Sequence, residues 1–86
     1  MIVGFNRHYE HDGKTFHIQV EDLGDEAGRF EARVYIQGSV IWSKRIPYES
    51  VIADDMPKQE RDHALRTQME KTLHTVVAAI AKGKIS

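Results

Sequence analysis

The last third of the chain is the feature that most constrains how it can fold. Apolar side chains recur there every three or four residues, the spacing that aligns them along one side of an α-helix. This stripe consists of Leu65, Met69, Leu73, Val76, Val77 and Ile80. We therefore predict one long amphipathic helix over residues 56–82.

The ends of this helix carry suitable signals. Asp54 and Asp55 are suitable N-cap residues, Pro57 suits the first turn, and Gly83 is a typical C-terminal residue. A helix of about 26 residues spans about 39 Å, whereas a seven-residue strand spans about 23 Å. Residues 58–63 contain no large apolar side chain. We expect them to project beyond the sheet or to meet a second copy.

The preceding sequence predicts strands. The clearest alternation places Phe16, Ile18 and Val20 on one face of a strand, and polar residues on the other. The four expected strands are residues 5–10, 15–21, 30–36 and 40–46. Together these elements predict an α+β fold with one domain over residues 1–86. A three- to four-stranded antiparallel meander is followed by one long C-terminal helix packed on one sheet face.

The hairpin at Gln37-Gly38-Ser39 has two possible registers. A two-residue turn suits the glycine and pairs Val34 with Ile41, which leaves Trp42 on the solvent face. A three-residue loop pairs Val34 with Trp42 instead. Burying Trp42 is worth on the order of 2–3 kcal/mol, so we expect it to be largely buried, in the core or under a partner.

Composition excludes several classes of protein. The chain has no cysteine, which rules out disulfides and thiolate metal sites and fits a cytoplasmic location. Twelve Lys and Arg against thirteen Asp and Glu give no basic excess for phosphate binding. No apolar run approaches the ~20 residues that span a bilayer, and the start lacks a signal-peptide pattern. We expect no membrane association.

One polar group on the expected sheet is a candidate ligand site. His17, Gln19 and Glu21 share a strand face, and Arg33 lies on a neighbouring strand. A histidine beside a carboxylate can transfer protons, but a solvated sheet face gives the same alternation without any function. The sequence has no nucleophile elbow and no phosphate-binding glycine loop. We therefore predict no catalytic residues and no enzyme.

Histidines also raise the question of a metal site. His8 and His11 differ by three residues, so a regular strand points them to opposite faces. His8 could lie across from His17 if a hairpin forms at Asp12-Gly13. Zinc needs three or four converging ligands. We therefore predict no metal site and no cofactor.

Part of the chain is superficially similar to a double-stranded-RNA-binding domain. Residues 30–38 followed by Ser43-Lys44-Arg45 are similar to a strand and a basic cluster of that module. In that family the cluster opens the final helix, whereas here Pro47 and a connector intervene. Nucleic-acid binding is therefore the third functional hypothesis.

A second resemblance covers most of the chain. Gly4-Phe5-Asn6, the segment Gly13–Asp22, Ser43-Lys44-Arg45 and Tyr48 resemble a pattern of short stand-alone bacterial proteins. These share a Phe-Asn start, a Gly-x-x-Phe-His-x-Gln-x-Glu-Asp strand and a long C-terminal helix. The resemblance implies a fold and no catalytic residues. It directs attention to the polar face of the strand.

These observations favour a small interaction or adaptor module with an unknown protein partner. We expect it to self-associate as a homodimer, through the helix or a sheet edge, because thin cores are often stabilised by pairing. The candidate interface residues are Tyr35, Trp42, Leu65, Met69 and Leu73. A small polar ligand on the wet sheet face, bound by His17, Gln19, Glu21 and Arg33, is the alternative.

Overall fold

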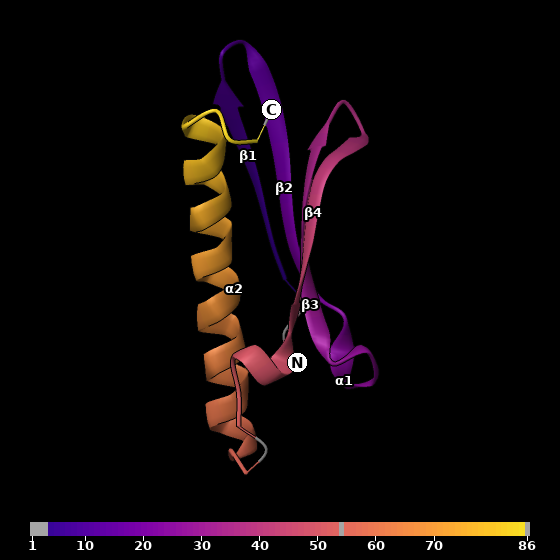
Figure 1. Cartoon of the computed structure of the whole chain (residues 1–86), viewed down its shortest axis with the longest axis vertical. Helices are drawn as coiled ribbons and strands as arrows, with labels where there is room; N and C mark the ends of the chain where they lie inside the picture. The colour runs from indigo at the N-terminus through magenta and orange to yellow at the C-terminus, as the bar shows by residue number, and fades with distance from the viewer. Residues whose placement is uncertain (1–3, 54, 86) are drawn as a thin grey trace.

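The computed structural model describes residues 4–53 and 55–85. Four strands form one antiparallel sheet of order β1-β2-β3-β4, and one long helix packs on one face (Figure 1). This architecture confirms the predicted α+β meander with a C-terminal helix. The elements are β1 (Gly4–His11), β2 (Lys14–Asp22), α1 (Gly24–Ala27), β3 (Arg29–Ile36), β4 (Ser39–Pro47), the 3₁₀ turn η1 (Tyr48–Ser50) and α2 (Lys58–Ala81).

Both hairpins close with two-residue turns. Asp12 and Gly13 have φ values of 50° and 75°, and Gln37 and Gly38 have 51° and 80°. Positive φ at both central residues defines the turn type whose twist matches that of paired strands. Glycine adopts this conformation without steric cost, which explains the glycine in each turn.

The β3–β4 register combines the two alternatives. The turn has two residues, as Gln37-Gly38 favours, and Tyr35 still pairs with Val40. A bulge then makes Ile41 an extra residue, so that Val34 pairs with Trp42. A one-residue shift moves a side chain to the other face of a sheet. The bulge therefore returns Trp42 to the helix-facing side while keeping the tight turn.

Helix α2 begins later than the sequence predicted. Pro57 occupies the N-cap with an extended backbone (φ −58°, ψ 150°) and no side-chain cap. Asp55 is exposed in a turn, so the prediction that it caps the helix is wrong, and Asp54 lies outside the described residues. Pro57 cannot donate a hydrogen bond but suits the boundary of a helix because its φ is fixed. The helix therefore runs over Lys58–Ala81, rather than the predicted 56–82.

The C-terminal end of α2 folds the chain back onto the core. Gly83 has a φ of 75°, and the Lys84 N–H donates to the Ala79 carbonyl at 2.9 Å. This is the six-to-one hydrogen bond of a glycine-ended helix. Ile85 then becomes 93% buried, with 7% of its surface exposed, in the core cluster. The tail after the helix is thus part of the packing.

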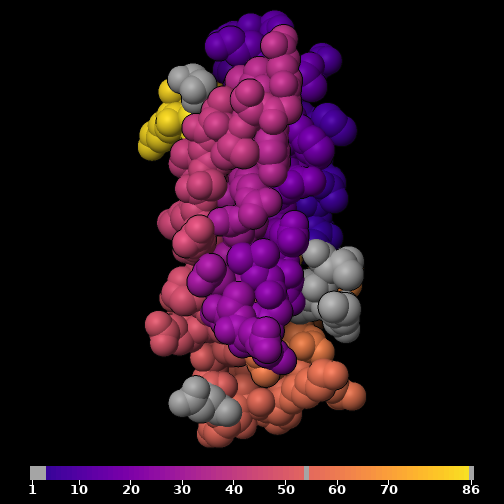
Figure 2. Space-filling view, turned by 90° about the vertical axis from the view of Figure 1, so that its right-hand side faces the viewer, coloured from indigo at the N-terminus to yellow at the C-terminus, as the bar shows by residue number. Residues whose placement is uncertain are grey.

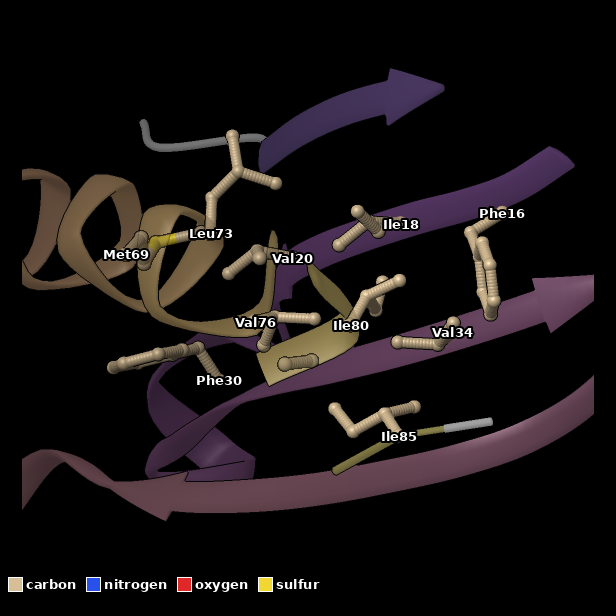
Figure 3. Packing of buried hydrophobic residues seen from close by; sticks show 11 residues of the cluster. Phe16, Ile18, Val20, Phe30, Val34, Met69, Leu73, Val76, Ile80 and Ile85 are labelled. Atoms are coloured by element: carbon tan, nitrogen blue, oxygen red, sulfur yellow. The ribbon is translucent and has the colours of Figure 1, made fainter. Parts of the chain in front are cut away.

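The core lies between α2 and the inward side of the sheet (Figure 3). Alternate residues of β2 and β3 meet the buried stripe of α2, as their spacing predicted. The stripe residues Leu65, Met69 and Leu73 are 3%, 0% and 7% exposed. They are therefore covered by the chain's own sheet.

The first turns of α2 meet the chain itself. Between β2 and β3 the chain forms the short helix α1. Asp25 of α1 forms an ion pair with Arg61, whose guanidinium lies 5.4 Å from the centre of the Tyr48 ring. Lys58 and His63 remain exposed. The projecting half of the helix therefore has intramolecular contacts that sequence reasoning did not foresee. In the described part of the chain, no helix has the length and apolar character needed to cross a membrane.

Candidate functional site

The outer face of the sheet, opposite α2, carries the predicted ligand residues. The strand register places His17 opposite Tyr35 and Gln19 opposite Arg33. Glu21 pairs with Glu31. Figure 2 shows this side of the molecule, with the strands at the surface in its upper part, the α1 segment in front lower down, and the start of α2 at the lower end. The structure therefore brings the predicted polar residues onto one surface.

Glu31 organises the middle of this face. It is only 6% exposed, although it lies on the sheet face opposite α2. Its Oε1 pairs with Arg33, and the Arg45 Nε donates to Oε2 at 3.2 Å. Burial raises the pKa of the Glu31 carboxyl, but hydrogen bonds from Arg45 and Arg33 outweigh burial and hold the pKa below its ordinary value. The carboxylate is thus a fixed charge between two cations.

Arg33 is committed to these neighbours. A hydrogen bond with Tyr35, and then one with Glu31, raises the pKa of its guanidinium. A ligand carboxylate or phosphate would have to compete with Glu31 for this cation. The predicted set His17, Gln19, Glu21 and Arg33 therefore shares a face, but its cation is already paired.

Two histidines stack on the same face. The rings of His8 and His17 have centroids 4.5 Å apart and planes inclined by 19°. Tyr35 continues the row, 5.9 Å from His17 with a tilt of 42°. His11 lies elsewhere, with its Nε2 3.4 Å from Asp12. Among residues 4–53 and 55–85, no three His, Asp or Glu side chains gather closely enough to surround a metal ion.

An open groove of about 700 Å³ begins beside this row. Pairing between β2 and β3 stops at His17 and Tyr35, and the two hairpin tips separate beyond that point (Figure 1). His8, Lys14, His17, Tyr35 and Gln37 contribute to its walls. The separation of the hairpins therefore leaves polar and aromatic side chains accessible.

A second groove runs between β4 and α2. The helix lies over β1 and β2 and makes less contact with β3 and still less with β4. This leaves a groove of about 420 Å³, in which Trp42 and Ile46 face Val76 and Ala79. Ile85 also lines it. The inward side of β4 is thus only partly covered by the chain.

The predicted interface residues divide between core and surface. Leu65, Met69 and Leu73 are buried in the chain's own core and offer almost no surface to a partner. Trp42 is half-buried in the β4–α2 groove, and Tyr35 is half-buried on the outer face. Only these two of the five offer surface to another molecule.

Asp22 and Tyr48, which the sequence analysis singled out in its second resemblance, are in contact. The Tyr48 hydroxyl donates to Asp22 Oδ1, which also accepts the Gly24 N–H at 3.1 Å. Burial and the bond to Asp22 raise the pKa of Tyr48, so the phenol stays protonated as a donor. This pair joins the end of β2 to η1. Its contacts give Asp22 and Tyr48 a structural role, which sequence spacing could not reveal because 26 residues separate them.

Comparison with known proteins gives no further guide to the site. No family model, curated protein or solved structure matches the chain.

Proposed function

We propose that this chain is a protein-interaction module that holds an apolar segment of an acidic partner in the groove between β4 and α2. The observation that carries the proposal is the incomplete cover of the sheet: α2 lies over β1 and β2, while the inward side of β4 remains open.

Trp42 supplies the anchor. It packs against the core and is only partly buried beside the groove. Tryptophan is enriched among the residues that dominate binding energy, because a large rigid side chain gains much area at small entropic cost. Ile46 extends the same apolar wall.

The chain's own C-terminal tail shows how an apolar side chain can occupy this groove. Ile85 enters one end of the groove from the short segment after α2 and becomes almost fully buried there. An apolar side chain from another molecule would gain the same kind of contact beside Trp42. The edge strand β4 also presents backbone groups that an extended segment could pair with.

Charge favours an acidic partner. Lys44 and Lys71 lie at the groove and are exposed, and they have no ion pair among the described residues. Arg45, by contrast, is engaged with Glu31. Acidic side chains flanking an apolar anchor would therefore meet unpaired cations on both walls.

The same charges disfavour the homodimer through this edge. An antiparallel pairing that sets Trp42 of one copy opposite Ile46 of another sets Lys44 opposite itself. Like charges directly opposite one another destabilise a strand pair. A different partner thus fits the groove better than a second copy, and self-association becomes an outcome of the test. A cytoplasmic location remains part of the proposal.

Trp42 is the chain's single tryptophan, so its fluorescence reports directly on the groove. The probe is a synthetic amphipathic peptide with leucines on one side and glutamates on the other. We expect it to shift the Trp42 emission to shorter wavelength, and a peptide with lysine in place of glutamate to leave the emission unchanged.

Matched variants locate the binding. Lys44→Glu with Lys71→Glu should weaken the acidic peptide about tenfold, or about 1.4 kcal/mol. Lys14→Glu, which changes an exposed lysine on the outer-face groove, should have no comparable effect. The proposal would be refuted if both variants lost the same affinity for the acidic peptide, or if no peptide changed the Trp42 emission. If light scattering showed a dimer, and if its formation shielded Trp42 from water, the occupant of the groove would be a second copy of the chain and the proposal of an acidic partner would be wrong.

The ligand hypothesis for the outer face is weaker. His17 and Gln19 do line an accessible groove, which supports it. Its cation, Arg33, is paired with Glu31, which removes the group best suited to bind an anion. Nucleic-acid binding has less support, because Arg45 in the basic cluster is likewise paired with Glu31 and the chain carries no excess of basic residues.

A further inference from the structure

The outer face carries an arrangement that the interaction module does not use. His8 and His17 lie directly opposite each other on β1 and β2. The two-residue turn makes His11 and Lys14 the closing pair of this hairpin. In an antiparallel hairpin the closing pair exchanges backbone hydrogen bonds, and the pairs beyond it alternate between non-hydrogen-bonded and hydrogen-bonded. His8 and His17 are the third pair beyond the closing one, so they form a non-hydrogen-bonded pair. Side chains approach most closely at such positions.

The orientation of the rings decides what they can bind. Rings that stack across neighbouring strands, as these do at 4.5 Å and 19°, turn their faces toward each other. The nitrogens lie on the ring edges, which the stacked partner ring does not cover. A planar ligand such as a nucleobase would need a free ring face. One face of His17 meets His8, and Tyr35 lies on its other side at 5.9 Å.

We propose that His8 and His17 form a two-histidine site for a divalent late first-row transition-metal ion: Cu²⁺, Ni²⁺ or Zn²⁺. Imidazole nitrogen is a preferred ligand of these ions. Metal–nitrogen bonds of about 2.0–2.1 Å at right-angled or tetrahedral geometry place the two nitrogens about 3 Å apart. The stack at 4.5 Å keeps the two rings within reach of one ion. To bind it, each ring must turn out of the stack so that the in-plane lone pair of its nitrogen points at the metal.

The two ligands leave open coordination positions. His8 is exposed and His17 is half-buried, so the metal would sit at the rim of the open groove. Water or a donor atom from another molecule would complete the coordination. The site is thus suited to a weakly held, exchangeable ion, because structural metal sites have four protein ligands.

The other histidines provide an internal comparison. His11 lies beside Asp12 and stacks with Tyr9 at 6.2 Å, so it belongs to a different environment. His63 and His74 are exposed on α2, eleven positions apart and therefore not one turn from each other. Only His8 and His17 are paired across strands.

The test uses the full chain with the metal chlorides alone. Histidine ring signals are followed by nuclear magnetic resonance with Zn²⁺, and affinities of all three ions by calorimetry. We expect one ion per chain, selective movement of the His8 and His17 signals, and affinity in the order Cu²⁺ > Ni²⁺ > Zn²⁺, the order known for nitrogen ligands with Cu²⁺ tightest.

Variants separate this site from adventitious binding. His8→Asn and His17→Asn should each lower the Ni²⁺ affinity at least tenfold, while the circular dichroism spectrum stays that of the folded chain. His74→Asn, the matched exposed control, should leave the affinity unchanged. The proposal is overturned if His74→Asn is as damaging as His8→Asn, or if the two ring signals stay unmoved at saturating metal. The peptide experiment on the β4–α2 groove is independent, because that groove lies on the opposite side of the sheet.

Discussion

The tail residue Ile85 offers the sharpest test of how the groove is built. It is 7% exposed and belongs to the cluster that contains Val34 and Ile80 (Figure 3). It also closes one end of the β4–α2 groove. Replacing it with alanine should therefore lower stability and open the groove at the same time.

The size of the loss follows from the atoms removed. Ile85→Ala deletes three carbon groups, each worth about 0.8 kcal/mol when buried, which gives an upper value of about 2.4 kcal/mol. The two residues after Gly83 can then fray, and each recovers about 1 kcal/mol of backbone entropy. We therefore expect a net loss between about 0.4 kcal/mol, if both residues fray completely, and about 2.4 kcal/mol, if the tail stays in place. The corresponding fall in Tm is about 2–19 °C for a domain of this size.

Urea denaturation followed by circular dichroism measures the loss. The emission of Trp42 should also move to longer wavelength before any unfolding, because water gains access to the groove. Lys84→Ala is the control: its side chain is exposed, and its backbone N–H still donates to Ala79. An Ile85→Ala variant as stable as Lys84→Ala, with unchanged emission, would refute the argument that the tail is part of the core.

Three further substitutions test the sheet and its junction with α1. The Glu31 carboxyl has a lowered pKa, so its contribution is complete above the unfolded-state pKa of about 4.3 and is lost as pH falls through the folded-state pKa. Glu31→Gln should be less stable than the parent chain at pH 7, and the difference in urea midpoint should shrink below pH 4; a difference independent of pH would contradict this reasoning. Gln37→Asn should raise the free energy of unfolding by about 0.5–1 kcal/mol, because asparagine tolerates the positive φ that Gln37 adopts. An unchanged urea midpoint would show that the turn is unstrained. Tyr48→Phe removes the hydrogen bond to Asp22 and should lower the free energy of unfolding by about 1–2 kcal/mol, measured by heat or urea. The loss stays modest because Asp22 still accepts the hydrogen bond from Gly24. No loss would mean that water satisfies the hydroxyl equally well.

The strands and the helix could be predicted because their signals are local. Alternation in β2 and β3 identified which residues face the core, and the stripe of α2 identified its buried side. The ends were harder to predict because several residues near each end can act as caps. Asp55 is a better N-cap by residue type, yet Pro57 marks the boundary because its backbone is already fixed there.

The hairpin register shows a limit of pairwise reasoning. Both simple alternatives assume regular pairing from the turn onward. The chain instead keeps the preferred turn and inserts a bulge at Ile41, which satisfies the turn and Trp42 together. A bulge adds one residue to one strand only, so the alternation of the opposite strand does not predict it.

The candidate surfaces were only partly predictable for a related reason. The sequence could place His17, Gln19, Glu21 and Arg33 on one face, because strand side chains alternate strictly. It could not show that Arg33 is held by Glu31, or that His8 stacks on His17. Those contacts depend on which strands are neighbours and on the register between them.

By itself, the sequence determined the four strands and the long helix, their order and the face that each one buries, because hydrophobic periodicity reports on local geometry. It did not reveal the short helix α1 or the turn η1. Only the tertiary structure decided which part of the sheet the single helix covers. The same apolar stripe could have lain over β3 and β4, and Leu65, Met69 and Leu73 could have met a partner. The helix instead packs over β1 and β2, since that position buries its stripe while Arg61 reaches Asp25 and Tyr48. The open side of β4, where we place the partner, is a consequence of that packing.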